Sequence, residues 1–226
     1  MTHRRRGRRL PALFLAALAV AGVAAPASAA PASAAPAPAV PLTTIGRGPR
    51  VVVLSNESDE DLTSWLPLAH ALAARGYRAV LWNYTSGPDT TLELATVLDE
   101  LRPTHARHIV LMGASVGAKT SIVTAARPSA TPIDGVVSLS AEALLRPAYD
   151  VVAEARTLHH PVLLATSAQD PYGSADTAAR LMAAVPDPDK RLVTVPGDAH
   201  GTALLDRPDG CAVLPAVLDF LRRHLH

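Results

Sequence analysis

Residues 108–119 read His-Ile-Val-Leu-Met-Gly-Ala-Ser-Val-Gly-Ala-Lys, and they carry the strongest local signal of fold in the chain. Its apolar run, residues 109–112, predicts a buried strand, and residues 118–127 are typical of a helix. Between them, residues 113–117 fit the pattern Gly-x-Ser-x-Gly, which places Ser115 on a sharp turn from strand to helix. A serine on such a turn crowds the positions two residues away on either side, so glycine is needed there. The stretch therefore predicts a nucleophilic serine at the tip of a strand–turn–helix unit.

The same residues also come close to a phosphate-binding loop. That motif has four residues between its glycines, and its lysine follows the second glycine directly. Here three residues separate Gly113 from Gly117, and Ala118 precedes Lys119. A nucleotide-binding protein that uses Lys119 is therefore the less favoured interpretation of this stretch.

The segments around this unit alternate between continuous apolar runs and helix-like patterns. Such alternation indicates an α/β fold in which a mostly parallel sheet has helices on both faces. Six strands are predicted, and residues 41–49 can supply at most one more, so we expect six to seven. Only residues 141–160 are available for a lid, which leaves room for about one helix. The predicted strands are 50–55, 77–82, 108–112, 135–140, 161–167 and 191–195, and the predicted helices are 61–75, 89–101, 118–127, 141–157, 174–184 and 211–224.

Composition narrows the function classes. The chain has 226 residues, 49% of them hydrophobic, and a net charge of +1. This length supports one domain with a substantial core, and the balanced charge argues against a nucleic-acid partner. A single cysteine, Cys211, excludes an intrachain disulfide. No Cys-x-x-Cys or His-Glu-x-x-His pattern is present, so we expect neither a metal nor another cofactor, and we expect a monomer.

The N-terminal residues predict export. Residues 1–10 are rich in arginine, residues 11–25 are almost wholly apolar, and small residues follow at two Ala-Ser-Ala sites. This order is typical of a secretory signal peptide, and either general or twin-arginine export fits it. We assign residues 1–29 to the signal peptide, 30–46 to an Ala/Pro-rich linker and 47–226 to the folded domain. The mature protein is then secreted or extracytoplasmic, with no stable insertion in a membrane.

A serine, an acid and a histidine follow three of the predicted strands. In open parallel sheets, ligands bind beyond the carboxyl ends of the strands. Ser115 follows the strand at 108–112, Asp170 follows the strand at 161–167, and His200 follows the strand at 191–195. This chain order, with the serine on a sharp turn, is the α/β-hydrolase arrangement.

Residues 50–222 resemble the α/β-hydrolase superfamily, and in particular its small esterases and dienelactone-hydrolase-like members. The matching pieces are Leu-Met-Gly-Ala-Ser-Val-Gly-Ala at 111–118, Pro-Val-Leu-Leu-Ala-Thr-Ser-Ala-Gln-Asp at 161–170 and Val-Pro-Gly-Asp-Ala-His-Gly at 195–201. The resemblance implies that Ser115 is the nucleophile, Asp170 the acid and His200 the base of a serine hydrolase. Such an enzyme cleaves carboxylic esters through an acyl-enzyme. The expected substrate is a small or surface-presented ester.

The resemblance also implies an oxyanion hole and a substrate pocket. We expect the backbone N–H groups of Val116 and Glu57 to bind the oxyanion. Asn56, Tyr84 and Tyr172 follow strand ends and are candidate substrate-binding residues.

The chain departs from the family in this region. Members of the family usually place His-Gly directly after the position of Leu54, whereas this chain has Ser55-Asn56 followed by Glu57, the first of several acidic residues. We expect these acidic residues to lie in a solvated loop. The departure keeps open a second interpretation, a catalytically impaired binding protein with the same fold.

Overall fold

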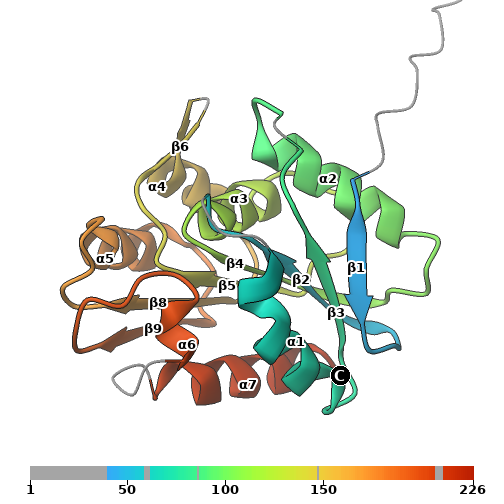
Figure 1. Ribbon diagram of the computed structural model, residues 1–226. Coiled ribbons are helices and arrows are strands. Elements are labelled where there is room, and N and C mark those ends of the chain that lie inside the picture. Colours follow the sequence, from blue (N-terminus) through green and yellow to red (C-terminus); the bar gives the residue numbers. More distant parts are fainter. Residues whose placement is uncertain (1–39, 59–61, 86, 147, 207–210) are drawn as a thin grey trace, which may run out of the picture. The chain divides into compact units, whose positions relative to one another are not determined.

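A computed structural model describes residues 40–58, 62–85, 87–146, 148–206 and 211–226 (Figure 1). The predicted signal peptide and most of the predicted linker lie outside these residues. The last part of the linker is described and needs correction, because Leu42–Ile45 form strand β1. This strand pairs antiparallel with β3 (Arg78–Trp82), so the sheet begins at residue 42 and the linker cannot extend to 46. The middle two residues of β1 are exposed, and the sequence therefore shows no apolar run there.

A seven-stranded sheet in the order β1-β3-β2-β4-β5-β8-β9 organises the domain. Every neighbouring pair is parallel except β1 with β3. The predicted mostly parallel sheet of six to seven strands is thus confirmed. The central strand, β4, places the serine turn at its carboxyl end. The remaining strands of the sheet are β2 (Arg50–Ser55), β4 (His108–Ala114), β5 (Gly135–Leu139), β8 (Val162–Ser167) and β9 (Lys190–Val195).

Helices cover both faces of this sheet (Figure 1). Alternate side chains of a strand point to opposite faces, so Val51 and Val53 belong to one buried cluster while Val52 and Leu54 belong to the other. Helices α2 (Thr90–Leu101), α3 (Val116–Ala125), α4 (Val151–Glu154) and α5 (Ser174–Ala184) pack on the first face. Helices α1 (Leu66–Ala73), α6 (Ala203–Asp206) and α7 (Val213–His224) pack on the second.

Helix boundaries follow local signals. The helix predicted at 61–75 is described from residue 62 as a 3₁₀ turn, η1 (Leu62–Trp65), that leads into α1. The chain leaves α1 through Gly76, whose φ of 79° is readily adopted only by glycine. Asp89 caps α2 by accepting a hydrogen bond from the N–H of Thr91 at 2.9 Å. Among the described residues, no helix has the length and apolarity that a membrane span needs.

The segment between β5 and β8 is less helical than predicted. It contains a two-stranded hairpin, β6 (Leu144–Leu145) with β7 (Tyr149–Asp150), before α4 and the 3₁₀ turn η2 (Ala155–Thr157). The carboxylate of Asp150 accepts hydrogen bonds from the N–H groups of Val152 and Ala153. This cap makes α4 begin at residue 151, so the helix cannot extend back to 141. The helical elements described in this segment, α4 and η2, have only four and three residues, in agreement with the small lid expected.

Candidate active site

The serine turn has the sharp geometry that its glycines predict. Ser115 lies between β4 and α3 with φ 51° and ψ −113°, a conformation outside the regions ordinarily allowed to non-glycine residues. A Cβ atom on Gly113 would lie 2.1 Å from the carbonyl oxygen of Gly117, and one on Gly117 would lie 2.1 Å from that of Ser55. Glycine is therefore required on both sides of Ser115, as the sequence indicated. The second contact also shows that α3 packs directly against the end of β2.

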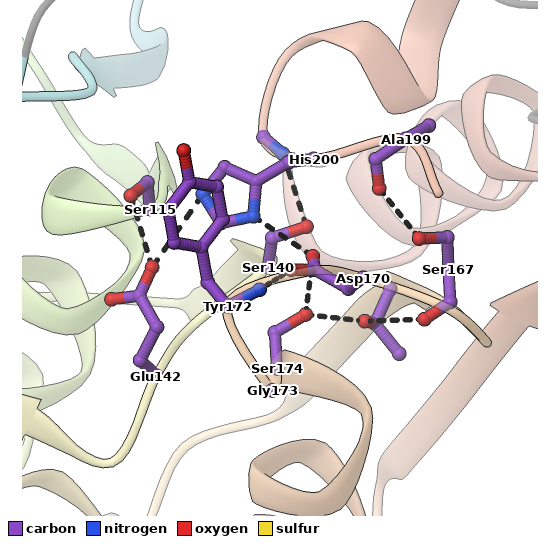
Figure 2. Close-up of polar contacts among 12 residues, drawn as sticks. Ser115, Ser140, Glu142, Ser167, Asp170, Tyr172, Gly173, Ser174, Ala199 and His200 are labelled. Carbon is purple, nitrogen blue, oxygen red and sulfur yellow. Dashed lines mark hydrogen bonds and ion pairs between the residues drawn. The ribbon is translucent and has the colours of Figure 1, made fainter. Parts of the chain in front are cut away.

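His200 and Asp170 form a hydrogen-bonded pair. The Nδ1 atom of His200 lies 2.8 Å from Oδ2 of Asp170, whose side chain is fully buried. That carboxylate also accepts hydrogen bonds from the hydroxyl of Ser174 at 2.6 Å and from the N–H of Tyr172 at 2.9 Å (Figure 2). Burial opposes the ionisation of Asp170, but these hydrogen bonds outweigh it and lower the pKa of Asp170 below its ordinary value. The pair is thus a carboxylate that orients an imidazole.

The loop that carries His200 is fixed on both sides. The hydroxyl of Ser167, at the end of β8, donates a hydrogen bond to the carbonyl of Ala199 at 2.7 Å. The N–H of Gly201 donates to the hydroxyl of Ser140 at 3.0 Å. Residues at the ends of β8 and β5 therefore fix the loop that carries the imidazole, although sequence patterns indicate only an exposed loop.

One cavity of about 440 Å³ brings several of the predicted site residues together. Ser115, His200, Val116, Glu57 and Tyr172 all line it. Val116 is the first residue of α3, so its N–H has no partner within the helix and is available to an oxyanion. The ring of Tyr172 lies 4.5 Å from the ring of His200, centroid to centroid. The full lining is Glu57, Ser58, Ser115, Val116, Lys119, Glu142, Tyr172 and His200.

Three lining residues, Ser58, Lys119 and Glu142, were not among the site residues predicted for a hydrolase. The hydroxyl of Ser115 donates a hydrogen bond to Oε1 of Glu142 at 3.1 Å, and the same oxygen lies 3.5 Å from Nε2 of His200 (Figure 2). The other oxygen of Glu142 forms an ion pair with Lys119. Lys119 therefore faces a carboxylate in this cavity, which argues against a phosphate-binding loop. Their positions in the sequence could have indicated that both residues lie near the site. Glu142 follows the strand β5, and Lys119 lies one helical turn after Ser115.

Glu57 is buried rather than solvated, and this corrects the expectation for the first acidic residue of its run. Its carboxylate accepts hydrogen bonds from the N–H and the hydroxyl of Thr202, at 2.7 and 2.8 Å. A Cβ atom on Gly201 would lie 2.3 Å from that carboxylate. Glu57 thus connects the loop after β2 with the loop that carries His200, and it also lines the cavity.

Asn56 and Tyr84 do not line the cavity around Ser115, although both were candidates for substrate binding. Asn56 is 1% exposed, and its side-chain amide donates to the carbonyl of Trp82 and to the side chain of Asn83. The hydroxyl of Tyr84 donates to the carbonyl of Asn56 at 2.6 Å. Both residues therefore brace the ends of β2 and β3. Burial accounts for the raised pKa of Tyr84 more than any other cause.

No metal site is evident in the described part of the chain. There, no three histidine, cysteine or acidic side chains are grouped so that they could hold an ion.

The polar groups that meet in the cavity are those of acyl transfer: a hydroxyl on a strained turn, an oriented imidazole and a helix N-terminus.

Comparison with known proteins identifies the fold. No family model and no curated protein matches the sequence. The solved monoacylglycerol lipase of Paleococcus ferrophilus is similar in structure, with a TM-score of 0.70, 17% identity, and 82% of this chain and 99% of that chain covered. The enol-lactonase of Burkholderia xenovorans aligns with a TM-score of 0.67 and 19% identity over 81% of this chain and 96% of its own. The dienelactone hydrolase of Anabaena variabilis aligns with a TM-score of 0.67 and 19% identity over 82% of this chain and 93% of its own. At such identities the likeness establishes the architecture, and the chain has the α/β-hydrolase fold.

Proposed function

We propose that this protein is an exported serine hydrolase that cleaves small carboxylic esters. The observation that carries the proposal is that Ser115, on its strained turn, lines one cavity together with His200, whose imidazole is hydrogen-bonded to Asp170. The structural neighbours are named as a lipase, a lactonase and a dienelactone hydrolase, and others as esterases, which supports ester chemistry.

In the proposed reaction, the hydroxyl of Ser115 attacks the ester carbonyl and His200 accepts its proton through Nε2. Asp170 keeps the other ring nitrogen protonated and stabilises the imidazolium that forms. The N–H of Val116, and that of Glu57 from the neighbouring loop, would bind the oxyanion. Each such donor is typically worth about 3–4 kcal/mol of transition-state stabilisation. His200 then returns the proton to the leaving alcohol, and water hydrolyses the acyl-enzyme.

The cavity favours a small, polar substrate. Apart from Val116 and Tyr172, its lining consists of charged or polar residues. A long acyl chain needs a continuous apolar groove, whereas these side chains would leave it in contact with carboxylates and an ammonium group. The small insertion between β5 and β8 leaves little chain to close over a lipid. We therefore expect short-chain or surface-presented esters to be preferred and interfacial activation to be absent.

Two measurements on the mature protein test this function. A fluorophosphonate should label wild-type protein at Ser115 and should not label the Ser115→Ala variant. A panel of esters with graded acyl length should show hydrolysis that declines with length and disappears in the same variant. Ser129→Ala, a change in the loop after α3 and away from the cavity, is the matched control and should retain both activities. Absence of labelling and hydrolysis in folded wild-type protein would contradict the proposal.

A binding protein without catalysis is the second candidate. Two observations favour it: the hydroxyl of Ser115 bonds to Glu142 rather than to His200, and Ser55-Asn56 stands at the end of β2 in place of the usual His-Gly. Such a protein would bind a small polar ester without turnover, and Ser115 would remain unlabelled.

Export is proposed from the sequence of residues 1–29. Expression of the full chain in a secreting bacterial host should release protein whose N-terminus lies between residues 30 and 41. Exported protein that still begins at Met1 would contradict the assignment of a cleaved signal peptide.

A further inference from the structure

The hydroxyl of Ser115 has a single proton to donate, and in the described hydrogen bonds it donates to Oε1 of Glu142 at 3.1 Å. Attack on an ester requires donation of that proton to Nε2 of His200 instead. Glu142 Oε1 also stands 3.5 Å from Nε2, so one carboxylate oxygen lies beside both groups that must exchange the proton (Figure 2). The arrangement in the structure is therefore a resting one.

The imidazole cannot correct this arrangement without a movement of Glu142 or of the serine hydroxyl. A carboxylate accepts hydrogen bonds and donates none, so the bond between Nδ1 of His200 and Asp170 places the proton of a neutral ring on Nδ1. Nε2 then presents a lone pair, and it faces an oxygen of Glu142 that is also only an acceptor. Glu142 thus competes with His200 for the proton of the Ser115 hydroxyl.

Lys119 keeps the carboxylate in this position. Its ammonium group pairs with Oε2 of Glu142, and both side chains are largely buried, at 10% and 20% exposure. An ion pair in such surroundings is screened less by water than one on the surface. Lys119 lies on α3 four residues after Ser115, so the hydroxyl and the ammonium group bind different oxygens of the same carboxylate.

We propose that Glu142 is a positioning residue that holds the Ser115 hydroxyl in a resting orientation, with Lys119 fixing its carboxylate. The inference rests on the proposed function. Substrate entry displaces the hydroxyl from Glu142 to His200, and only then does the triad connect. Glu142 does not take part in bond formation; it sets how often the free enzyme is ready to react.

Labelling kinetics test this directly, because they follow the reactivity of Ser115 in the absence of substrate. We would measure the second-order rate of inactivation by diisopropyl fluorophosphate for the mature wild-type protein, Glu142→Ala and Glu142→Gln. Loss of a hydrogen bond to a charged acceptor predicts labelling about tenfold faster in Glu142→Ala. Glu142→Gln keeps an oxygen acceptor without the charge, and neutral acceptors are roughly half as strong, so its rate should fall between the other two.

Further measurements distinguish a change in Ser115 reactivity from a general disturbance of the structure by the substitution. The kcat/KM for a short-chain ester should rise in parallel with labelling, since both report on the free enzyme. Glu154→Ala is the matched control, because Glu154 pairs with Arg127 at 3.5 Å outside the cavity, and it should leave the labelling rate unchanged. Thermal unfolding of each variant identifies any loss of folding.

The outcomes distinguish the inference from the function on which it rests. Faster labelling in the order wild type, Glu142→Gln, Glu142→Ala supports the resting role. Equal or slower labelling in both folded variants overturns it, and a parallel loss of kcat would instead make Glu142 part of the chemistry. If Glu142→Ala does not fold, the nearly isosteric Glu142→Gln decides. Failure of wild-type protein to label at all overturns the proposed function as well.

Discussion

Replacing Ser115 with glycine should stabilise the protein more than replacing it with alanine, even though both changes remove the hydroxyl. Ser115 has φ 51° and ψ −113°, a backbone conformation that alanine tolerates as poorly as serine does. Glycine has no Cβ and adopts positive φ readily. The two variants lose the same hydrogen bond to Glu142, so that contribution cancels and the difference between them measures the backbone strain.

The magnitude follows from two opposing contributions. A residue held in such a sparsely populated region costs about 1–3 kcal/mol. Glycine loses roughly 0.5–1 kcal/mol more than alanine in backbone entropy on folding. The net expectation is a glycine variant more stable than the alanine variant by about 1 kcal/mol, which corresponds to about 2–4 °C in Tm for a domain of this size.

Urea unfolding of Ser115→Gly and Ser115→Ala, followed by circular dichroism at neutral pH, measures this difference. Fluorophosphonate labelling should be absent from both proteins, which confirms that any stability gain comes without activity. A glycine variant that is equal to or less stable than the alanine variant would refute the reasoning. The turn would then be an unstrained feature, and the link between conformation and reactivity would have to be abandoned.

Three further predictions concern the same site. Gly117→Ala should destabilise the domain by about 3 kcal/mol in urea unfolding, because its Cβ would meet the carbonyl of Ser55 at 2.1 Å; a loss below about 0.5 kcal/mol would show that α3 can move away. Ser174→Ala should raise the pKa of Asp170, because it removes a hydrogen bond that lowers this pKa. In the wild-type protein the lowered pKa of Asp170 stabilises the folded state above about pH 4, and this stabilisation is lost as the pH falls. Unfolding should therefore show a larger deficit for this variant at pH 7 than at pH 3, and an equal deficit at both would contradict it. Asp170→Asn should lower kcat on a short-chain ester by about 10⁴ through the wrong tautomer of His200, whereas near-normal turnover would remove Asp170 from the triad.

The sheet was predictable because its strands carry their signal locally. β2, β4 and β8 are buried along nearly their whole length, so each appears in the sequence as a continuous apolar run. β1 was assigned to the linker because an edge strand pairs on one side only and exposes part of its side chains. The hairpin before α4 was missed for a similar reason, since each of its strands has two residues and Leu144 is exposed.

The candidate site was predictable where a residue's role depends on its place after a strand. Ser115, Asp170 and His200 follow three neighbouring or nearly neighbouring strands, and parallel pairing alone brings their positions to one edge. Glu142 also follows a strand, but its contact with Ser115 depends on the rotamers of two side chains from different elements. A sequence pattern carries no such information, and the ion pair with Lys119 was equally hidden.

Glu57 shows how an apparent departure from the family can be explained in the fold. A free carboxylate beside a developing oxyanion would oppose catalysis. Its carboxylate instead accepts two hydrogen bonds from Thr202, and the absence of a Cβ on Gly201 leaves room for it. Hydrogen bonding directs that charge toward Thr202 in the loop that carries His200, so Glu57 helps to fix the position of that loop. The buried carboxylate of Glu57 therefore requires glycine at position 201, directly after His200.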